Sequence, residues 1–474
     1  MKRLALPLLL ALAFPAHASA GGPTMLIGAT EDAVRQPTLV GVKAQMDLLQ
    51  LAGFNAVRVT QVWAPGRTKP DEDDVRVLTN IVDAAKLDGV TVMVTVTNFG
   101  NRTTPLTLEA RDEFAAYTAA LARALPSVRY FVVGNEPNIN RYWLPQFNPD
   151  GSDAAAPAYE ALLAEAYDAL KDVSPKINVL GGAISPRGGD DPDSIRPTHS
   201  PTAFIQDMGE AYRASGRTRP IMDALAFHPY EDNSSVAPVD GRHPNSKTIA
   251  LADYDKLVNV LGTAFDGTGQ RGRTLPIYYT EFGVESQIPA AKNKLYTGIE
   301  PTAVKPVPED VQGKYYRQAI ELAFCQPTVR GLSIFHTIDE PDLNRWQSGV
   351  FYVDRKPKSS MAVVRRAAAE AHRGVVARCA GMRLRVRVSP FRPAASPRPG
   401  VTFRCDLDCG YVLTARRGAR TVVTRRGTAI GNVDKRVLLG RLKPGLYLLR
   451  LEATASLNPG PTRTVGARLL VPKK

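Results

Sequence analysis

The sequence is poor in the features that mark several protein classes. Beyond its N-terminal segment, no stretch reaches the ~18 consecutive apolar residues that cross a bilayer. It lacks a Gly-x-Ser-x-Gly elbow, which argues against Ser-His-Asp hydrolysis. The segment Gly28-Ala29-Thr30-Glu31-Asp32 follows the first strand-like run and is not the glycine-rich loop of a dinucleotide-binding fold. We therefore expect no membrane span and no nucleotide cofactor.

Metal ligands are equally sparse. The sequence has six histidines and four cysteines. His199, His243 and His372 lie in predicted loops or helices without the spacing of metal ligands. The pair Cys405 and Cys409 lacks the second ligand pair that a zinc site needs. We expect no metal ion and no other cofactor.

Charge is distributed unevenly along the chain, whose formal net charge is +14. Residues 380–474 hold 20 basic and 4 acidic residues, whereas residues 1–379 hold 40 and 42. The main body therefore has no basic excess for binding nucleic acid. For the basic tail we expect a polyanionic partner, such as an acidic polysaccharide or a cell-envelope polymer. A compositional bias toward arginine is the alternative explanation, and the tail lacks the interleaved aromatic residues of a single-strand binder.

The N-terminus has the pattern of a targeting segment. Lys2 and Arg3 precede an apolar run from Leu4 to Phe14, and Ala18-Ser19-Ala20 supplies the small residues that signal peptidase requires. This apolar run is too short to span a bilayer. We expect residues 1–20 to be a cleaved signal peptide and the protein to be secreted.

From residue 21 to 378, apolar strand-like runs alternate with amphipathic helical segments. Continuous apolar runs such as Val92-Met93-Val94 are typical of strands that are buried on both faces of a parallel sheet. Eight such runs with helices between them predict one closed (β/α)8 barrel over residues 21–378. The expected strands are Thr24–Thr30, Ala56–Trp63, Thr91–Phe99, Arg129–Asn135, Asn178–Ser185, Ala224–Tyr230, Ile277–Phe282 and Gly331–Ile338. The expected helices include Asp71–Leu87, Leu106–Leu125, Pro157–Asp172 and Asp310–Phe324.

The last part of the chain has a different pattern. Short β-type runs are separated there by glycine, proline and aspartate, which predicts a small β-sandwich over residues 379–474. The expected runs are Met382–Val388, Val401–Cys405, Tyr411–Ala415, Thr421–Thr424, Arg436–Leu439 and Leu446–Ala453.

The four cysteines allow three pairings, of which we favour one. Cys405 and Cys409 lie close together in the tail. Cys325 and Cys379 each fall at the end of a predicted helix, and neighbouring helices of a β/α barrel end at the same face. We therefore expect two disulfides, Cys325–Cys379 and Cys405–Cys409, as suits an oxidising compartment.

Two glutamates stand where a β/α barrel carries its chemistry, at the C-terminal ends of the strands. The fourth expected strand ends in Gly134-Asn135-Glu136-Pro137-Asn138 and the seventh in Thr280-Glu281-Phe282-Gly283. Hydrolysis of a glycosidic bond needs such a pair, because one carboxylic acid protonates the leaving oxygen and the other carboxylate attacks the anomeric carbon or activates a water. The pair therefore indicates a glycoside hydrolase.

These motifs resemble those of the retaining β-glycoside hydrolases of clan A, which are β/α barrels with Asn-Glu ending the fourth strand and Glu ending the seventh. The cellulase-like family 5 and the xylosidase- and iduronidase-containing family 39 look nearest, and the resemblance covers roughly residues 24–375. It implies that Glu136 is the general acid/base and Glu281 the nucleophile. It also implies that Asn135 hydrogen-bonds the sugar 2-hydroxyl.

Three further residues fit the same pattern. By the resemblance, Arg58 on the second expected strand lies beside the nucleophile and lowers its pKa. His228-Pro229-Tyr230, which ends the sixth expected strand, is similar to the His-x-Tyr of the family, in which the tyrosine holds the nucleophile and the histidine lines the sugar subsite. The alternatives are an ion pair of Arg58 with Glu31 or Asp32, and a structural role for His228.

The three tryptophans all follow expected strands. Trp63 follows the second, Trp143 the fourth and Trp346 the eighth. Aromatic faces pack against the C–H surfaces of sugars, so we expect these side chains to bind substrate. Core packing under long loops is the alternative.

The sequence departs from the family pattern in two places. The third expected strand ends in Thr97-Asn98-Phe99, where many family 5 members carry a histidine. On the eighth strand, Phe335 and His336 stand where a tryptophan often forms the floor of the subsite. Phe335, His336 or Trp346 is expected to replace it. The nearby carboxylates Asp339 and Glu340 are expected to bind substrate or shape the loop.

Together these features predict a secreted, retaining β-glycoside hydrolase that cleaves a poly- or oligosaccharide by double displacement. Retention requires carboxyl groups about 5–5.5 Å apart, against roughly 6.5–9.5 Å for inversion. The alternative is a catalytically silent carbohydrate-binding or cell-surface protein on the same barrel. The sugar and the linkage depend on loops such as Arg141–Ala156, Arg187–Ser200 and Ser286–Pro308.

Overall fold

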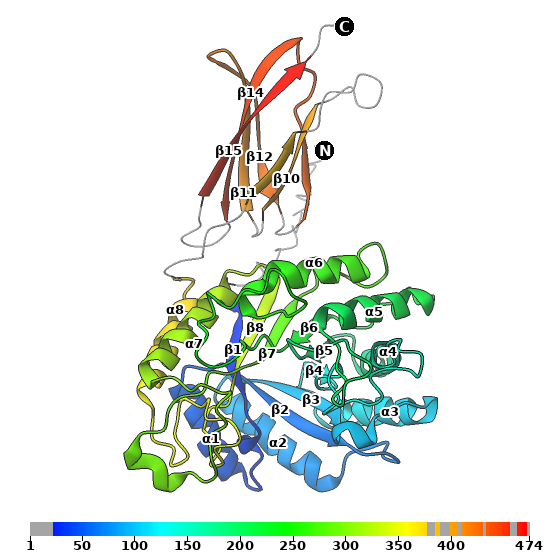
Figure 1. Ribbon diagram of the computed structural model, residues 1–474, viewed down its shortest axis with the longest axis vertical. Helices are drawn as coiled ribbons and strands as arrows, with labels where there is room; N and C mark the ends of the chain where they lie inside the picture. The colour runs from blue at the N-terminus through cyan, green and yellow to red at the C-terminus, as the bar shows by residue number, and fades with distance from the viewer. Residues whose placement is uncertain are drawn as a thin grey trace, which may run out of the picture.

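The protein contains a closed eight-stranded parallel barrel (Figure 1). The computed structural model describes residues 22–376, 384–388, 399–405, 409–429, 433–455 and 462–471. The strands pair in chain order and β1 pairs with β8, which closes the barrel. They are β1 (Leu26–Thr30), β2 (Ala56–Trp63), β3 (Thr91–Asn98), β4 (Tyr130–Val133), β5 (Asn178–Ile184), β6 (Ala224–Phe227), β7 (Ile277–Phe282) and β8 (Val329–Phe335).

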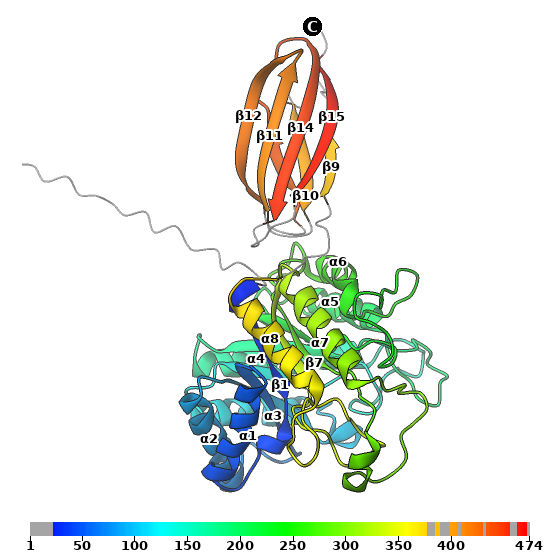
Figure 2. The same ribbon diagram turned by 90° about the vertical axis from the view of Figure 1, so that its left-hand side faces the viewer.

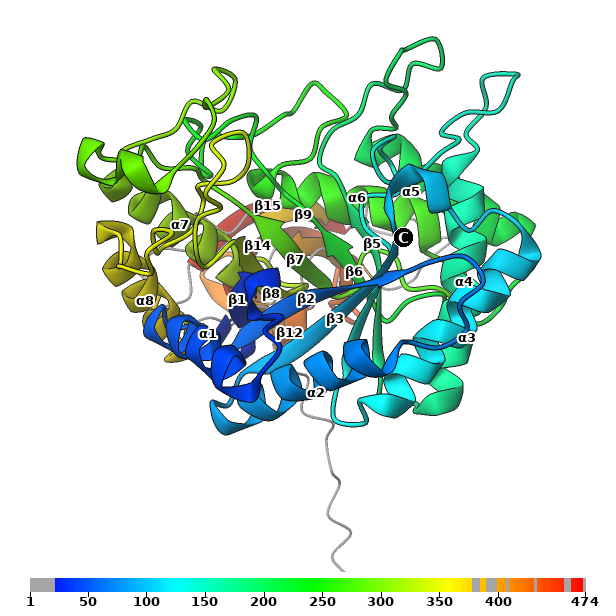
Figure 3. The ribbon, with the colours of Figure 1, turned by 90° about the horizontal axis from the view of Figure 1, so that it is seen from below.

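A helix follows each strand, and the helices lie around the outside of the barrel (Figure 3). They are α1 (Leu39–Leu51), α2 (Glu72–Leu87), α3 (Leu108–Ala124), α4 (Ala155–Val173), α5 (Pro201–Ala214), α6 (Tyr254–Phe265), α7 (Glu309–Phe324) and α8 (Ser359–His372). The predicted (β/α)8 fold is confirmed. All parallel strands point the same way, so their C-terminal ends share one face of the barrel.

Side chains alternate between two cores along each strand. On β3, Val92 and Val94 belong to the core between strands and helices, whereas Met93 belongs to the smaller core inside the barrel. On β2, Val57 and Val59 lie in the outer core. Because successive side chains point to opposite faces, Arg58 between them is directed into the barrel. The same alternation brings other polar side chains to the inside at the strand ends.

The C-terminal part forms a separate all-β unit, as predicted (Figure 2). One antiparallel sheet has the order β13-β10-β9 and the other β12-β11-β14-β15, and Phe403, Leu413 and Leu451 lie in the core of this unit. The strands are β9 (Leu384–Val388), β10 (Gly400–Cys405), β11 (Cys409–Arg417), β12 (Arg420–Ala429), β13 (Lys435–Leu438), β14 (Gly445–Ala455) and β15 (Thr462–Val471). The last of these, β15, is absent from the sequence prediction.

The cysteine predictions divide between described and undescribed residues. Cys405 and Cys409 form the predicted disulfide. Cys325, the residue after α7, is disulfide-bonded, whereas its predicted partner Cys379 lies outside the described residues. The helix α8 ends at His372, before Cys379. The predicted signal peptide and the predicted boundary at residue 378 also lie outside the described residues. Within the described part, the helices are too short or too polar to cross a membrane.

A buried ion pair fixes the long loop between β8 and α8. Lys358 Nζ contacts Asp339 Oδ1 at 2.7 Å, and both side chains are fully buried. The same ammonium donates to Ser286 Oγ at 2.8 Å and to the carbonyl of Gln347 at 3.1 Å. One cation thus ties the β8–α8 loop to the segment after β7. The sequence suggested Asp339 as a residue that binds substrate or shapes the loop. Its carboxylate is instead paired with Lys358 inside the loop.

Removing this cation is expected to destabilise the barrel strongly. Lys358→Met keeps the bulk of the side chain but leaves Asp339 buried without its charge partner, which costs about 3–5 kcal/mol of unfolding free energy. Urea unfolding followed by tryptophan fluorescence measures it, because all three tryptophans lie in the barrel. The double variant Lys358→Met/Asp339→Leu should recover much of the loss, since it buries no charge. An unchanged urea midpoint in Lys358→Met would contradict the structural role.

Candidate active site

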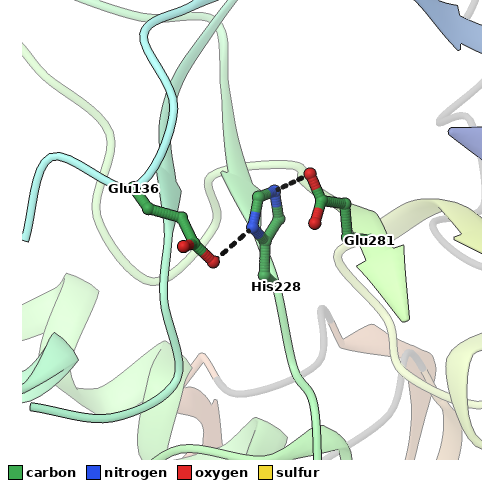
Figure 4. A group of neighbouring side chains, drawn as sticks. All are labelled: Glu136, His228 and Glu281. Carbon is green, nitrogen blue, oxygen red and sulfur yellow. Dashed lines mark hydrogen bonds and ion pairs between the residues drawn. The ribbon is translucent and has the colours of Figure 1, made fainter. Parts of the chain in front are cut away.

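Three ionisable side chains from different strand ends meet at one point of the barrel face. Glu136 follows β4, His228 follows β6 and Glu281 belongs to β7, and one polar atom of each lies within 4.8 Å of the others. The imidazole of His228 stands between the two carboxyl groups (Figure 4). Its Nδ1 is 2.9 Å from Glu136 Oε1 and its Nε2 is 3.6 Å from Glu281 Oε1. His228 is fully buried, whereas the carboxylates are 14% and 12% exposed.

An unusual backbone turn presents Glu136. Gly134 directly follows β4 with φ of 78°, and Glu136 itself has φ of 43°. A positive φ is uncommon and costly for a residue with a Cβ, so the neighbouring structure must hold it. One such restraint is the Glu136 N–H, which donates to the carbonyl of Ala183 on β5 at 2.9 Å. The strain therefore sits on a residue whose side chain reaches the site.

An irregularity in β7 turns Glu281 inward. Tyr279 and Phe282 both lie in the outer core although they are three residues apart, which regular alternation does not allow. The pairing of β7 with β8 shifts register between these two residues. A β-bulge of this kind interrupts the alternation and changes the face of the sheet to which a side chain points. Glu281 consequently points to the barrel opening rather than toward the helices.

The carboxylate of Glu281 is held on both oxygens. Arg58 Nη1 donates to Oε1 at 2.5 Å, and the Tyr230 hydroxyl donates to Oε2 at 3.0 Å. The same guanidinium donates to Asn135 Oδ1 at 2.9 Å and to Thr95 Oγ1 at 2.6 Å. Arg58 is thus an ion-pair partner of Glu281 rather than of Glu31 or Asp32.

The charges around Glu281 favour its ionised form. Burial alone would raise the pKa of this carboxyl, but the charges of His228 and Arg58 and the hydrogen bonds from Arg58 and Tyr230 outweigh it. They hold the pKa below its ordinary value. For Tyr230, burial and the nearby charges of Glu281 and Glu136 raise the pKa well above normal, so its hydroxyl stays a neutral donor. The fixed cation Arg58 also makes the cluster a poor site for a metal ion.

The tryptophan prediction needs correction. Trp63 and Trp143 are 0% and 1% exposed and lie in the outer hydrophobic core, in edge-on contact with Phe114 and Tyr159 respectively. Neither ring has a face open to a sugar, because Trp63, the last residue of β2, and Trp143, in the loop after β4, both pack in this core. Core packing, the alternative weighed from the sequence, describes both.

Trp346 is half-buried and does reach the site. Its ring lies 5.1 Å from that of Tyr230 and 5.3 Å from that of Phe335, centroid to centroid. Glu340 holds this part of the loop, because its Oε2 accepts a hydrogen bond from the Trp346 N–H at 3.1 Å. Glu340 thus shapes the loop. A pocket of about 280 Å³ opens beside Trp346, and Arg187, Asn233 and Asn344 lie on its wall.

Two residues at the site were missed from the sequence. Tyr142 lies near the carboxyl pair, since the charges of Glu136 and Glu281 contribute, after burial, to raising its pKa to about 12. Asn98 donates to the carbonyl of Tyr142 at 2.9 Å, so the position that departs from the family pattern fixes this loop. The tyrosine follows β4 by several residues, and no local spacing marks it as part of the site.

Several known proteins are similar to this chain. A family model described as cellulase, glycosyl hydrolase family 5, matches residues 20–294. No curated protein sequence matches the chain. Among solved structures, a family 39 glycoside hydrolase from the gut symbiont Bacteroides cellulosilyticus WH2 is similar, with 14% identity, a TM-score of 0.52, and coverage of 89% of this chain and 81% of that chain.

Two further solved structures show weaker similarity. A glucosidase from Croceicoccus marinus has 11% identity and a TM-score of 0.49, with 89% of this chain and 95% of that chain covered. The endo-β-1,4-mannanase from Thermotoga petrophila has 10% identity and a TM-score of 0.46, with 96% and 99% covered. At such identities the structural likeness concerns the fold alone. The family model, however, spans more than half of the sequence, so the chain belongs to the cellulase family, glycosyl hydrolase family 5, and is a glycoside hydrolase.

Proposed function

We propose that the protein is a retaining β-glycoside hydrolase that works by double displacement on a poly- or oligosaccharide. One observation carries the proposal: an oxygen of Glu136 lies within 4.8 Å of an oxygen of Glu281. This short separation supports the carboxyl spacing of about 5–5.5 Å in retaining enzymes rather than the roughly 6.5–9.5 Å of inverting enzymes.

In the first step, Glu281 acts as nucleophile and Glu136 as acid. A Glu281 oxygen attacks the anomeric carbon while the Glu136 carboxyl transfers its proton to the glycosidic oxygen, so that bond breaks and a glycosyl ester forms on Glu281. Arg58 and Tyr230 keep Glu281 ionised and oriented for this attack. The side-chain oxygen of Asn135 is occupied by Arg58, so its NH₂ is the end available to the sugar 2-hydroxyl.

In the second step, Glu136 changes role to base. Formation of the ester removes the negative charge of Glu281, which lies across His228 from Glu136. Loss of a nearby like charge favours ionisation of the remaining carboxyl. Glu136 then takes a proton from water, and the resulting hydroxide attacks the anomeric carbon from the face that the leaving group vacated. The ester bond breaks and Glu281 leaves as a carboxylate. Two inversions give net retention.

Substrate binding is proposed for the rings of Trp346, Tyr230 and Phe335 and for the pocket beside them. Apolar ring faces suit the C–H surfaces of a pyranose, and the polar wall of the pocket supplies hydrogen bonds. Arg187 and Val304 on that wall come from two of the loops expected to set specificity. His228 is fully buried, so its contribution to sugar binding passes through Glu136.

The test is reducing-sugar release from β-glucans, xylan, mannan and β-galactan, followed by proton NMR of the first product formed. Release of a β-anomer that later equilibrates supports the proposal, whereas an initial α-anomer would establish inversion. Binding of a glycan without any release would favour the silent barrel.

The pH profile should respond to Arg58. In Arg58→Gln the pKa of Glu281 rises because its cation is gone, and attack requires the ionised form. As the pH is lowered, the variant therefore loses activity at a higher pH than the wild type. The acid limb of its kcat/KM profile shifts upward by about one pH unit or more. Arg76→Gln, an exposed arginine on α2, is the matched control. An unmoved limb with lower overall activity would mean that Arg58 only supports the fold.

We further propose that the protein is exported and that its β-unit binds a polyanion. The motif at residues 1–20 supports export, which N-terminal sequencing of secreted protein tests. On β12, Arg420, Arg425 and Arg426 are all exposed, and exposed charges attract polyanions in a salt-dependent way. Retention on immobilised polygalacturonate that disappears in 0.5 M NaCl is expected for full-length protein, and retention that salt does not change would contradict it.

A further inference from the structure

A second cluster of ionisable side chains lies outside the carboxyl pair. Asp153 precedes α4, His199 precedes α5 and Asp207 lies within α5, and one candidate ligand atom of each is within 4.8 Å of the others. His199 Nε2 is 3.3 Å from Asp153 Oδ1. The cluster therefore joins the β4–α4 loop to the first turns of α5.

In this cluster the side chains of Asp153 and His199 are buried, Asp207 is half-buried, and one carboxylate oxygen lacks a hydrogen-bond partner. The Asp153 side chain is 7% exposed and that of His199 is 3% exposed. Asp153 Oδ1 accepts the N–H of Ala156 at 2.9 Å, but Oδ2 is buried without a hydrogen-bond donor. Its neighbour Asp207 is another acid, so two carboxyl groups face each other and, when both are ionised, repel unless a proton or a metal cation lies between them. A buried polar oxygen of this kind requires a partner.

The surrounding donors define which cation fits. His199 Nε2 donates a hydrogen bond to the carbonyl oxygen of Gln146 at 2.8 Å, so this nitrogen must lose its proton before it can bind a metal ion. On the other side, His199 Nδ1 faces the carboxylate of Asp190 at 4.0 Å, and a carboxylate behind the ring is the usual second partner of a metal-ligating histidine. Calcium and magnesium prefer oxygen alone, whereas imidazole with carboxylates suits zinc or manganese.

We propose that Asp153, His199 and Asp207 bind a divalent transition-metal ion with the ligand preference of Zn²⁺. The ion displaces the Nε2 proton that Gln146 O accepts, and it binds Nε2 of His199 together with carboxylate oxygens of the two aspartates. The site cannot be recognised from the spacing of residues in the sequence, because its ligands come from two loops and a helix that meet only in the folded barrel.

The proposed ion would stabilise the segment that carries Glu136. Gln146 Nε2 donates to the carbonyl of Pro137 at 3.0 Å, and the His199 N–H donates to the carbonyl of Asn138 at 2.8 Å. Gln146 beside the cluster and His199 within it thus hold the two residues that follow Glu136. The ion's role is structural, since it lies outside the carboxyl pair.

The experiment titrates full-length protein, stripped with EDTA and dialysed, with ZnCl₂ by calorimetry and follows thermal unfolding. For the wild type we expect one site attributable to the cluster and a rise in Tm of about 4 °C at saturating Zn²⁺. In Asp207→Asn we expect binding at that site to weaken by about 100-fold or more and the Tm rise to vanish. Without metal, this variant should be at least as stable as wild type, because it removes a like charge.

Two controls assign the signal to the cluster. Glu210→Gln removes an exposed carboxylate from the same helix and should leave the affinity unchanged. Glu136→Gln disrupts the other histidine–carboxylate group and should keep the Tm rise, which excludes Zn²⁺ binding between Glu136 and Glu281. No binding, or equal affinity in wild type and Asp207→Asn, would overturn the proposal. Asp153, whose pKa burial and Asp207 raise to about 7, would then share a proton with its neighbour.

Discussion

Replacing Glu281 by glutamine is expected to lower kcat by roughly 10⁵-fold, the scale seen when an enzyme loses its nucleophile. The amide has nearly the same shape, and its oxygen can still accept the hydrogen bond from Arg58. It cannot, however, form the glycosyl ester, because a neutral amide is a far weaker nucleophile than a carboxylate. The measurement is the initial rate on the best glycan from the substrate panel, with circular dichroism to show that the fold is retained.

A neighbouring glutamate provides the matched control. Glu285 lies four residues further along, is buried, and has a pKa raised to about 7 by burial, yet it accepts a hydrogen bond from the Gln347 N–H rather than joining the carboxyl pair. Glu285→Gln should keep kcat within about 10-fold of wild type, since it removes no group in contact with the reacting atoms. If Glu281→Gln retains more than a hundredth of the wild-type rate, another residue must be the nucleophile.

The barrel could be predicted from the sequence because its signals are local. Buried parallel strands produce continuous apolar runs, and helices between them produce a period near 3.6, so both elements are visible without knowledge of their partners. Each expected strand overlaps an observed one within a few residues at its ends. The edge strand β15 was missed because it alternates weakly, with Gly466 and several exposed positions in its length.

The convergence of Glu136, Arg58 and Glu281 could also be anticipated, because in a closed barrel all strand ends share one face. The sequence did not show whether the side chains of each loop turn toward the helix layer or toward the site. Trp63 ends β2 and points outward like Val57 and Val59. Trp143 and Trp346 both lie in loops, yet one ring turns into the helix layer and the other to the site. The direction depends on contacts with distant parts of the chain, such as that of the Trp346 ring with Tyr230.

The same limit applies to the cluster of Asp153, His199 and Asp207. No spacing motif links these residues, because two loops and a helix supply them. The shared face of the strand ends could be anticipated, but proximity that arises where two loops pack against a helix could not be recovered from the sequence. The bulge in β7 is a further case, since regular alternation would have directed Glu281 away from the site.

Replacing Glu136 by alanine should separate the two chemical steps. Polysaccharide hydrolysis is expected to fall by about 10²–10⁴-fold, because the leaving oxygen of a sugar needs a proton. A 2,4-dinitrophenyl β-glycoside of the preferred sugar needs none, since dinitrophenolate leaves unaided. The ester on Glu281 then forms at nearly the normal rate but hydrolyses slowly without a base. The expected time course is a burst of one dinitrophenolate per enzyme molecule, followed by slow steady-state release.

Azide then distinguishes the roles of the two glutamates. In Glu136→Ala, azide can enter the space of the lost carboxyl group and attack the ester without a base, so the steady rate should rise and the product should be the β-glycosyl azide. In Glu281→Gly, azide occupies the position of the nucleophile and attacks from the opposite face, which gives the α-glycosyl azide. The opposite outcome would exchange the assignments of Glu136 and Glu281. Absence of any glycosyl azide from both variants would contradict double displacement at this pair, because its stereochemistry requires one attacking group on each face of the anomeric carbon.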